Sequence, residues 1–331
     1  MNQSSFLFDA PPSPSSPPAT PPDAAPALAL PPLEDMARRL EQDPDYRVLR
    51  RLVPRADFGP APPEPLVRRV LVLDTETTGL VHQTDKIIEL AMLLVQVDAH
   101  SGLPFGPVEV FEGFEDPGMP IPAVAKEVTG ISDEMVQGQR LDDASVEAMV
   151  ARADLIVAHN AGFDRPFVEA RFPVFAGKAW ACSFADIDWK AAGAASARLG
   201  ALLLDHGWFF DAHRAQVDCH ALLQLLARPP GSSPVTGLSL LISAAALPSF
   251  KLRATGSPFE SKDVLKARGY RWDAEARVWS CTLPDPARLE AELEWLKAEV
   301  YGRRSARVDV EALDSLVRYS ARPGVLSQRA L

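Results

Sequence analysis

Prolines are concentrated at the start of this chain, and they limit where a folded core can form. Sixteen of the 31 prolines lie in residues 1–66, and ten of those fall in the first half of that segment. A stretch so rich in proline propagates neither a helix nor a sheet ladder, so residues 1–32 are expected to be disordered or polyproline-like. Residues 33–66 are expected to hold short helices, interrupted at Pro44, and a linker.

The segment 67–228 alternates between strand patterns and helix patterns. Strands are predicted over 69–75, 87–97, 108–114 and 154–159, and helices over 143–152, 162–171, 196–206 and 214–227. The second strand is long and nearly all apolar, which suits a central strand buried on both faces. This alternation is typical of an α/β layered domain, and about 160 residues are enough to bury a core.

The rest of the chain divides into three further parts. Residues 229–248 open with a cluster of Pro, Gly and Ser, which indicates a linker. Residues 249–302 contain short strands and two amphipathic helices, which predict a small α+β module. Residues 303–331 are expected to form a basic tail with one weak helix.

Charge is distributed unevenly along the chain. The net charge of −10 is the sum of −3 over residues 1–66, −10 over 67–228 and +3 over 229–331. The mean therefore does not exclude a nucleic-acid partner, although phosphate binding favours basic surfaces. Three dispersed cysteines without a Cys-x-x-Cys pair argue against a disulfide framework. With no long apolar run and no basic-then-apolar leader, no membrane partner and a cytoplasmic location in a bacterium are expected.

Two acidic residues end the first predicted strand, in the sequence Leu73-Asp-Thr-Glu-Thr-Thr-Gly79. Asp74 and Glu76 are two residues apart, so in a strand their side chains project to the same face. Adjacent carboxylates repel each other unless a cation neutralises them, and Mg²⁺ and Mn²⁺ prefer such oxygen ligands. The alternative, on pattern alone, is an acidic turn after a strand.

Two further motifs combine histidine with aspartate. His159-Asn-Ala-Gly-Phe-Asp164 ends another predicted strand, and by itself Asp164 is explained as a carboxylate favoured at a helix N-terminus. In His213-Arg-Ala-Gln-Val-Asp218 the five-residue separation is not a same-face helical spacing. His213 is therefore expected at the entry to a helix and Asp218 in its second turn, both reaching one site.

Taken together, these three motifs resemble the DEDDh family of 3′→5′ exonucleases, which includes the proofreading epsilon subunit of bacterial replicative polymerases. The resemblance covers residues 69–228. It implies a ribonuclease H-like fold, a mixed five-stranded sheet with flanking helices. It also implies that two Mg²⁺ or Mn²⁺ ions are held by Asp74, Glu76, Asp164 and Asp218, and that His213 takes a proton from the attacking water.

The resemblance further implies a DNA 3′ end as substrate, most often single-stranded, with release of nucleoside 5′-monophosphates. Candidate substrate contacts are Thr77, Leu80, His159, Asn160 and Phe163. For Leu80 and Phe163 the alternative is ordinary core packing. A DNA polymerase is a candidate partner. The rival functions are a 3′→5′ exoribonuclease and a non-catalytic accessory protein that binds nucleic acid or a clamp.

Two other segments carry candidate binding residues. The small module combines aromatic residues with Lys262, Lys266, Arg268, Arg271 and Arg277, a composition suited to nucleic acid, although its Tyr and Trp residues are also needed for a core. Near the N-terminus, Gln3, Leu7 and Phe8 resemble a sliding-clamp-binding peptide. The alternative for this trio is a chance group of residues.

Overall fold

The computed structural model describes residues 32–302 and 304–331, in two units. The first ends at Val48 and contains α1, Leu33–Glu41, whose described residues are all solvent-accessible. Glu34 and Arg38 form an ion pair of 3.4 Å one turn apart on this helix. The helix ends before Pro44, as expected, whereas nearly all of the predicted disordered tail lies outside the described residues. Among the described residues, no helix is long and apolar enough to cross a membrane.

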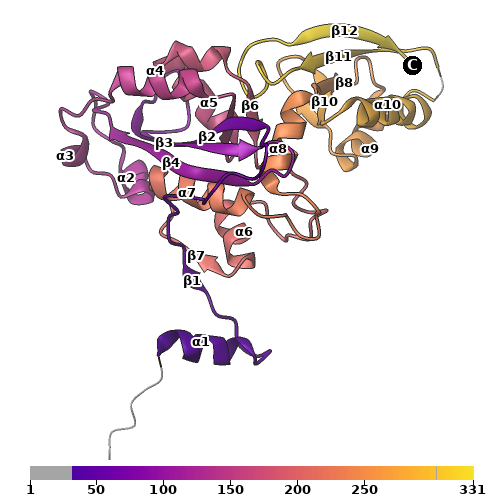
Figure 1. Ribbon diagram of the computed structural model, residues 1–331. Helices are drawn as coiled ribbons and strands as arrows, with labels where there is room; N and C mark the ends of the chain where they lie inside the picture. The colour runs from indigo at the N-terminus through magenta and orange to yellow at the C-terminus, as the bar shows by residue number, and fades with distance from the viewer. Residues whose placement is uncertain (1–31, 303) are drawn as a thin grey trace, which may run out of the picture. The chain divides into compact units, whose positions relative to one another are not determined.

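The second unit, Leu49–Leu331, is built on a mixed five-stranded sheet. Its strands, in the spatial order β4-β3-β2-β5-β6, span Pro104–Phe114, Ile87–Asp98, Val67–Thr77, Leu155–Ala158 and Trp180–Cys182. The first three pair antiparallel, while β5 pairs parallel with both β2 and β6. This arrangement confirms the predicted ribonuclease H-like class of mixed sheet with flanking helices (Figure 1).

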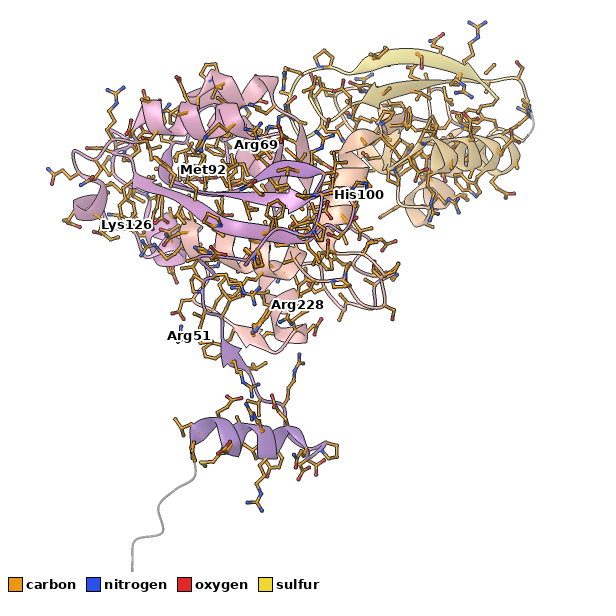
Figure 2. The ribbon with its side chains drawn as sticks, in the orientation of Figure 1. Arg51, Arg69, Met92, His100, Lys126 and Arg228 are labelled. Carbon is orange, nitrogen blue, oxygen red and sulfur yellow. The ribbon has the colours of Figure 1, made fainter. Side chains whose placement is uncertain are left out.

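Alternating residues of the central strands pack against helices on opposite faces of the sheet. Leu71 and Leu73 share a core with α4, Asp143–Arg152, and α5, Ala161–Arg171. Met92 of β3, labelled in Figure 2, belongs to the same core.

Val70 and Val72, on the opposite face of β2, pack against three other helices: α6, Leu199–Asp205, α7, Ala215–Leu226, and α8, Gly237–Ala246. Figure 1 shows α7 across the sheet from α4 and α5. Nearly every residue of β3 is buried, as the apolar run predicted.

Shorter elements complete this part of the chain. The helices α2, Ala123–Thr129, and α3, Asp133–Val136, surround a small cluster with Ile88, and η1 spans Pro173–Gly177. The two-residue strands β1, Arg50–Arg51, and β7, Trp208–Phe209, pair parallel. The guanidinium of Arg51 lies 4.9 Å from the ring centroid of Phe209, and that of Arg228 lies 4.0 Å from that of Trp208; both arginines are labelled in Figure 2.

The C-terminal module contains a second five-stranded sheet, in which every pair is antiparallel. Its elements are β8 (Ser249–Arg253), η2 (Phe259–Ser261), α9 (Lys262–Ala267), β9 (Arg271–Asp273), β10 (Val278–Leu283), α10 (Pro286–Trp295), the π-helical turn η3 (Leu296–Val300), β11 (Arg307–Leu313) and β12 (Val325–Ala330). The strand order is β12-β11-β8-β10-β9. The core contains Tyr270, with Trp279 and Trp295 packed against it, so the structural explanation of these aromatic residues holds.

Two sequence-based expectations for this region are wrong. The predicted basic tail over 303–331 contributes β11 and β12 to the module's sheet, because apolar Val308 and Val310 alternate with polar residues and are buried. The predicted linker over 229–248 contains α8, whose N-terminus is capped by the Thr236 hydroxyl accepting from the Ser239 amide at 3.1 Å. The Pro-rich cluster that indicated a linker extends only over its first residues.

The loop between β11 and β12 contacts the larger sheet's helix α5. The guanidinium of Arg165, which is fully buried, donates hydrogen bonds to the carbonyl oxygens of Ser315, Leu316 and Arg318. Arg318, 3% exposed, in turn donates to the Ala244 carbonyl at 2.7 Å. We call residues 314–322 the docking loop.

Candidate active site

Asp74 and Glu76 lie at the carboxyl end of β2, on the face that packs against α7. They share the parity of Val70 and Val72, so alternation along the strand carries the two carboxylates to that face. Glu76 is 8% exposed and Asp74 is half-buried. The sequence prediction that the two side chains share one face is borne out by this placement.

Asp164 reaches the same place from α5. The parallel pairing of β2 and β5 brings their carboxyl ends to one edge, and α5 begins three residues after β5. Asn160 makes the connecting turn in the left-handed region, at φ 73°. The buried Asp164 Oδ1 then accepts hydrogen bonds from the Thr75 amide (3.1 Å) and hydroxyl (2.8 Å), which fix it beside β2.

Asp218 and His213 come from the start of α7. The helix begins at Ala215, so Asp218 lies in its first turn and not in the second turn that was predicted. Asp218 Oδ2 accepts a hydrogen bond from the Arg214 amide at 3.1 Å, which ties the first turn of the helix to the residue before it. His213 precedes the helix, is exposed, and has a left-handed backbone at φ 68°.

Three of the carboxylates are close enough to share a cation. Asp74, Glu76 and Asp218 each offer an oxygen, and these oxygens lie within 4.8 Å of one another. Asp164 lines the same pocket with both its neighbours, Asp74 and Glu76. An all-oxygen set of this kind suits a hard divalent cation.

The electrostatics of the cluster also favour a cation. Burial raises the pKa of Glu76 to about 8 and that of Asp164 to about 7, and it raises the pKa of Asp218 to about 6. Burial, followed by the charges of Asp164, Asp218 and Glu76, holds the pKa of Asp74 well above its usual value. When all four carboxyl groups are ionised, they repel one another. A divalent cation among them offsets this repulsion.

A further acid beside the cluster, Glu89, was not predicted from the sequence. It lies on β3 directly opposite Glu76 and is fully buried. Its Oε1 accepts from Arg214 Nε (3.2 Å) and Nη2 (3.0 Å), and its Oε2 accepts from the Ala215 amide (3.0 Å). The available signal was a single acid within the otherwise apolar run 87–95.

The carboxylates open into a pocket of about 700 Å³. Of the predicted substrate contacts, His159, Asn160 and Phe163 line it, and Phe163 also packs on the core. Thr77 and Leu80 are not among the lining residues. The Thr77 hydroxyl donates to the Gly79 carbonyl at 2.6 Å, whereas Leu80 is 83% exposed, so core packing does not explain it.

His159 is held in one orientation beside the carboxylates. Its Nδ1 lies 2.7 Å from the Ser183 hydroxyl, and its ring meets Phe184 edge-on with centroids 5.7 Å apart. Burial lowers the pKa of His159 to about 4, so the ring is neutral at neutral pH. Several other lining residues were not predicted from the sequence, among them Phe184, Arg198 and Phe210, because they approach only in the folded chain.

The five basic candidates of the C-terminal module are all exposed, but they differ in their partners. Arg268 forms an ion pair with Glu292 at 2.9 Å and lies over the Trp295 ring at 4.8 Å, which explains it structurally. Lys262 and Arg277 line a second pocket. Lys266 and Arg271 have no ion-pair partner among the described residues. The clamp-binding trio Gln3, Leu7 and Phe8 lies outside the described residues.

Comparison with known proteins gives this fold and site a class. Residues 71–226 match the family model RNase_T, whose description is "Exonuclease". That segment contains all four carboxylates and His213, and it therefore belongs to this DnaQ-like family of exonuclease domains.

Particular relatives share this part of the chain. The DNA polymerase III of the PolC type from Listeria welshimeri is 37% identical over 103 residues, and the one from Streptococcus pyogenes serotype M5 is 35% identical over 104. The matches cover 30% and 31% of this chain but only 7% of each relative.

Similar solved structures include exonuclease X in complex with 5′-overhanging duplex DNA. It is 23% identical with a TM-score of 0.41, and the match covers 52% of this chain and 98% of that one. A zinc-bound E. coli ExoI–ssDNA complex is 16% identical with a TM-score of 0.40, covering 57% and 48%.

Proposed function

We propose that the protein is a metal-dependent 3′→5′ exonuclease that removes nucleoside 5′-monophosphates from DNA. The observation that carries the proposal is the gathering of Asp74, Glu76, Asp164 and Asp218, with His213, around one open pocket. These groups come from three different elements, β2, α5 and the start of α7. Structural stability alone gives no reason to concentrate four carboxylates that oppose each other's ionisation.

The chain's own residues have distinct roles in this proposal. When bound by the four carboxylates, two Mg²⁺ or Mn²⁺ ions would neutralise the phosphate and favour attack by water. His213 would accept the proton of that water on a ring nitrogen, as histidine does near neutral pH. Phe163 would pack against the terminal base or sugar, and His159 and Asn160 would contact the end of the strand. Thr77 and Leu80 lie outside the pocket lining. They would contact a substrate only if the incoming strand extends beyond the pocket.

DNA is the proposed substrate because the relatives from Listeria and Streptococcus that match this chain are DNA polymerases. A single-stranded 3′ end is proposed, with a role in repair, end processing or proofreading, and a polymerase or sliding clamp as partner. A 3′→5′ exoribonuclease is the main alternative, because ribose discrimination depends on a contact to the 2′-hydroxyl.

The test is degradation of 5′-labelled single-stranded DNA, and of RNA of matched sequence, with Mg²⁺, with Mn²⁺ or with EDTA. The proposal expects a ladder that shortens from the 3′ end of DNA and requires metal. Asp74→Ala should abolish it, whereas Glu147→Ala, which removes an exposed acid of α4, should leave it unchanged. A ladder on RNA alone would show that the substrate is RNA. No ladder on either substrate would contradict the proposed exonuclease activity.

A further inference from the structure

The C-terminal module has a pocket of its own, of about 500 Å³, that the proposed hydrolysis does not use. It lies where the loop after β8 and the start of α9 meet the β9–β10 hairpin. The aromatic and cationic residues that line it are Phe259, Lys262, Trp272, Arg277 and Trp279. Its volume is within the range of pockets that hold small organic ligands.

Two large aromatic side chains of this pocket are exposed to solvent. Phe259 is 76% exposed and Trp272 is 51% exposed, although a module this small needs its aromatic residues for the core. Trp272 pairs across the hairpin with Trp279, and the two rings meet edge to face at 5.6 Å. Trp279 packs on the core and therefore holds Trp272 in place. The module thus presents aromatic faces on a rigid base.

The loop that forms another wall is also fixed. The hydroxyl of the buried Tyr301 donates to the Thr255 carbonyl at 2.8 Å, and the Ala254 amide donates to the Trp279 carbonyl at 2.8 Å. These bonds tie the loop to both the helical side and the sheet side of the module. The pocket therefore exists before any ligand arrives, which lowers the entropic cost of binding.

Two cations of the pocket have no anionic partner within the described chain. Lys262 Nζ lies 4.6 Å from the ring centroid of Phe259, and neither Lys262 nor Arg277 has an ion-pair partner among the described residues. Arg268 of the same module, by contrast, is neutralised by Glu292. Arg277 has a left-handed backbone at φ 51°, an unusual conformation for arginine. The Asp273 carboxylate fixes this turn by accepting from the Glu275 and Ala276 amides.

We propose that this pocket binds a nucleotide of single-stranded DNA, with the base stacked on Trp272 or Phe259 and the phosphates contacted by Lys262 and Arg277. Exposed aromatic faces select a planar ring, and two unpaired cations select an anion beside it. Stacking platforms next to cations are the usual means of holding single strands without reading their sequence. The inference deepens the proposed function, since it supplies a second grip on the substrate of the exonuclease domain.

The experiment measures binding of a fluorescently labelled oligothymidylate of about twelve nucleotides by anisotropy. It uses the full chain carrying Asp74→Ala, in EDTA, so that no hydrolysis occurs and the metal-free carboxylates repel phosphate. Trp272→Ala should weaken binding about tenfold, which is within the range measured for one stacked base. Lys262→Ala and Arg277→Gly should each weaken it severalfold and make it less sensitive to salt.

The variants are chosen so that misfolding does not imitate the result. Glycine accepts the positive φ of Arg277, so Arg277→Gly removes the charge and preserves the turn. Trp272→Phe retains an aromatic face and should recover most of the affinity. Arg288→Ala, which removes an exposed arginine of α10 outside the pocket, should bind like the parent.

The nucleotide pocket and the exonuclease activity can be disproved separately. If Trp272→Ala and Arg277→Gly bind the oligothymidylate as tightly as the Arg288→Ala control, the pocket is not a nucleotide site, even if the active chain degrades DNA. Loss of binding in the pocket variants, together with no degradation by the active chain, would support the pocket and overturn the exonuclease. A blunt duplex should compete poorly, because its bases are already stacked; equal competition would also overturn the inference.

Discussion

Glu89 shows how one residue outside the carboxylate cluster controls its geometry. Its carboxylate holds both the Arg214 side chain and the Ala215 amide, so it fixes the point where α7 begins. His213 and Asp218 lie on either side of that point. Glu89 is therefore a positioning residue for the two groups.

We predict that Glu89→Ala lowers the free energy of unfolding by about 3 kcal/mol, since it leaves the buried Ala215 amide without its acceptor and Arg214 with only its longer pair to Glu112. It should also reduce kcat at saturating metal. Chemical denaturation and steady-state kinetics measure the two effects. Glu89→Gln keeps an acceptor and should recover part of the stability. A kcat of Glu89→Ala equal to that of the parent chain would contradict the positioning role.

Arg198 contributes the only lysine or arginine side chain among the described residues that line the carboxylate pocket. It is exposed at the start of α6, where it can meet the phosphate backbone of an incoming strand. We predict that Arg198→Ala raises KM for single-stranded DNA about fivefold and changes kcat little. Kinetics at two salt concentrations measure this, and an unchanged KM at low salt would refute it.

The sequence indicated the site residues unequally. Asp74 and Glu76 were predictable from strand periodicity and charge, whereas Asp164 alone looked like a helix N-terminal carboxylate. The resemblance to a family, and not local pattern, joined Asp164 and Asp218 to them. Glu89 left only the signal of a single acid in an apolar run, and Arg198 left none, because the residues around them approach only through tertiary contacts.

At the scale of elements, long periodic segments were predictable and short ones were not. All four strands and all four helices expected within 67–228 are present, with ends shifted by a few residues. The strands β1, β6 and β7 have two or three residues each, too few to show a period. For β11, alternation was present, but the many arginines around it suggested a tail.

Helix α7 is the element that carries the third motif against the sheet. Leu222 of α7 is 2% exposed within the core it shares with β2 and β3. We predict that Leu222→Ala lowers the free energy of unfolding by about 3 kcal/mol, because it leaves a cavity. Leu222→Met conserves volume and should lower it by less than about 1.5 kcal/mol. Urea denaturation measures both, and equal losses would contradict close packing at this position.

At the scale of the whole molecule, the carboxylate cluster makes stability depend on pH and metal. The pKa of Glu76 is raised to about 8 and that of Asp218 to about 6, above their values in an unfolded chain. At a pH between the pKa of these carboxyl groups in the unfolded chain and their raised pKa in the native state, the native state binds more protons than the unfolded state. Without metal, stability therefore falls as pH rises through this window.

We predict that Mn²⁺ raises Tm by several degrees more at pH 8 than at pH 6, because at the lower pH it competes with bound protons. Thermal unfolding with Mn²⁺ or EDTA at the two pH values measures the difference. Asp218→Asn should shrink the metal-dependent gain. The same gain at both pH values would show that the cluster is not the metal site.

The docking loop links the C-terminal module to α5 through the buried Arg165. We predict that Arg165→Met lowers the free energy of unfolding by about 3 kcal/mol and exposes residues 314–322 to proteolysis. The substitution removes three hydrogen bonds to the docking loop and the ion pair with Glu169. Arg152→Met, which breaks an exposed pair with Glu109, should change stability by less than about 1 kcal/mol. Limited proteolysis followed by mass spectrometry would detect the cleavage, and equal protection in both variants would contradict the role of Arg165.

The same loop has a consequence for how separable the two halves of the protein are, in the laboratory and during evolution. It connects β11 to β12, so its contacts with α5 are made by a loop of the module's own sheet. A truncation after residue 302 would remove two strands from one half. In the other half, the buried Arg165 would lose its three carbonyl acceptors and keep the Glu169 carboxylate. Gene fusions or deletions that respect modular boundaries must therefore keep the docking loop, or replace Arg165, before loss of activity can be attributed to loss of the module.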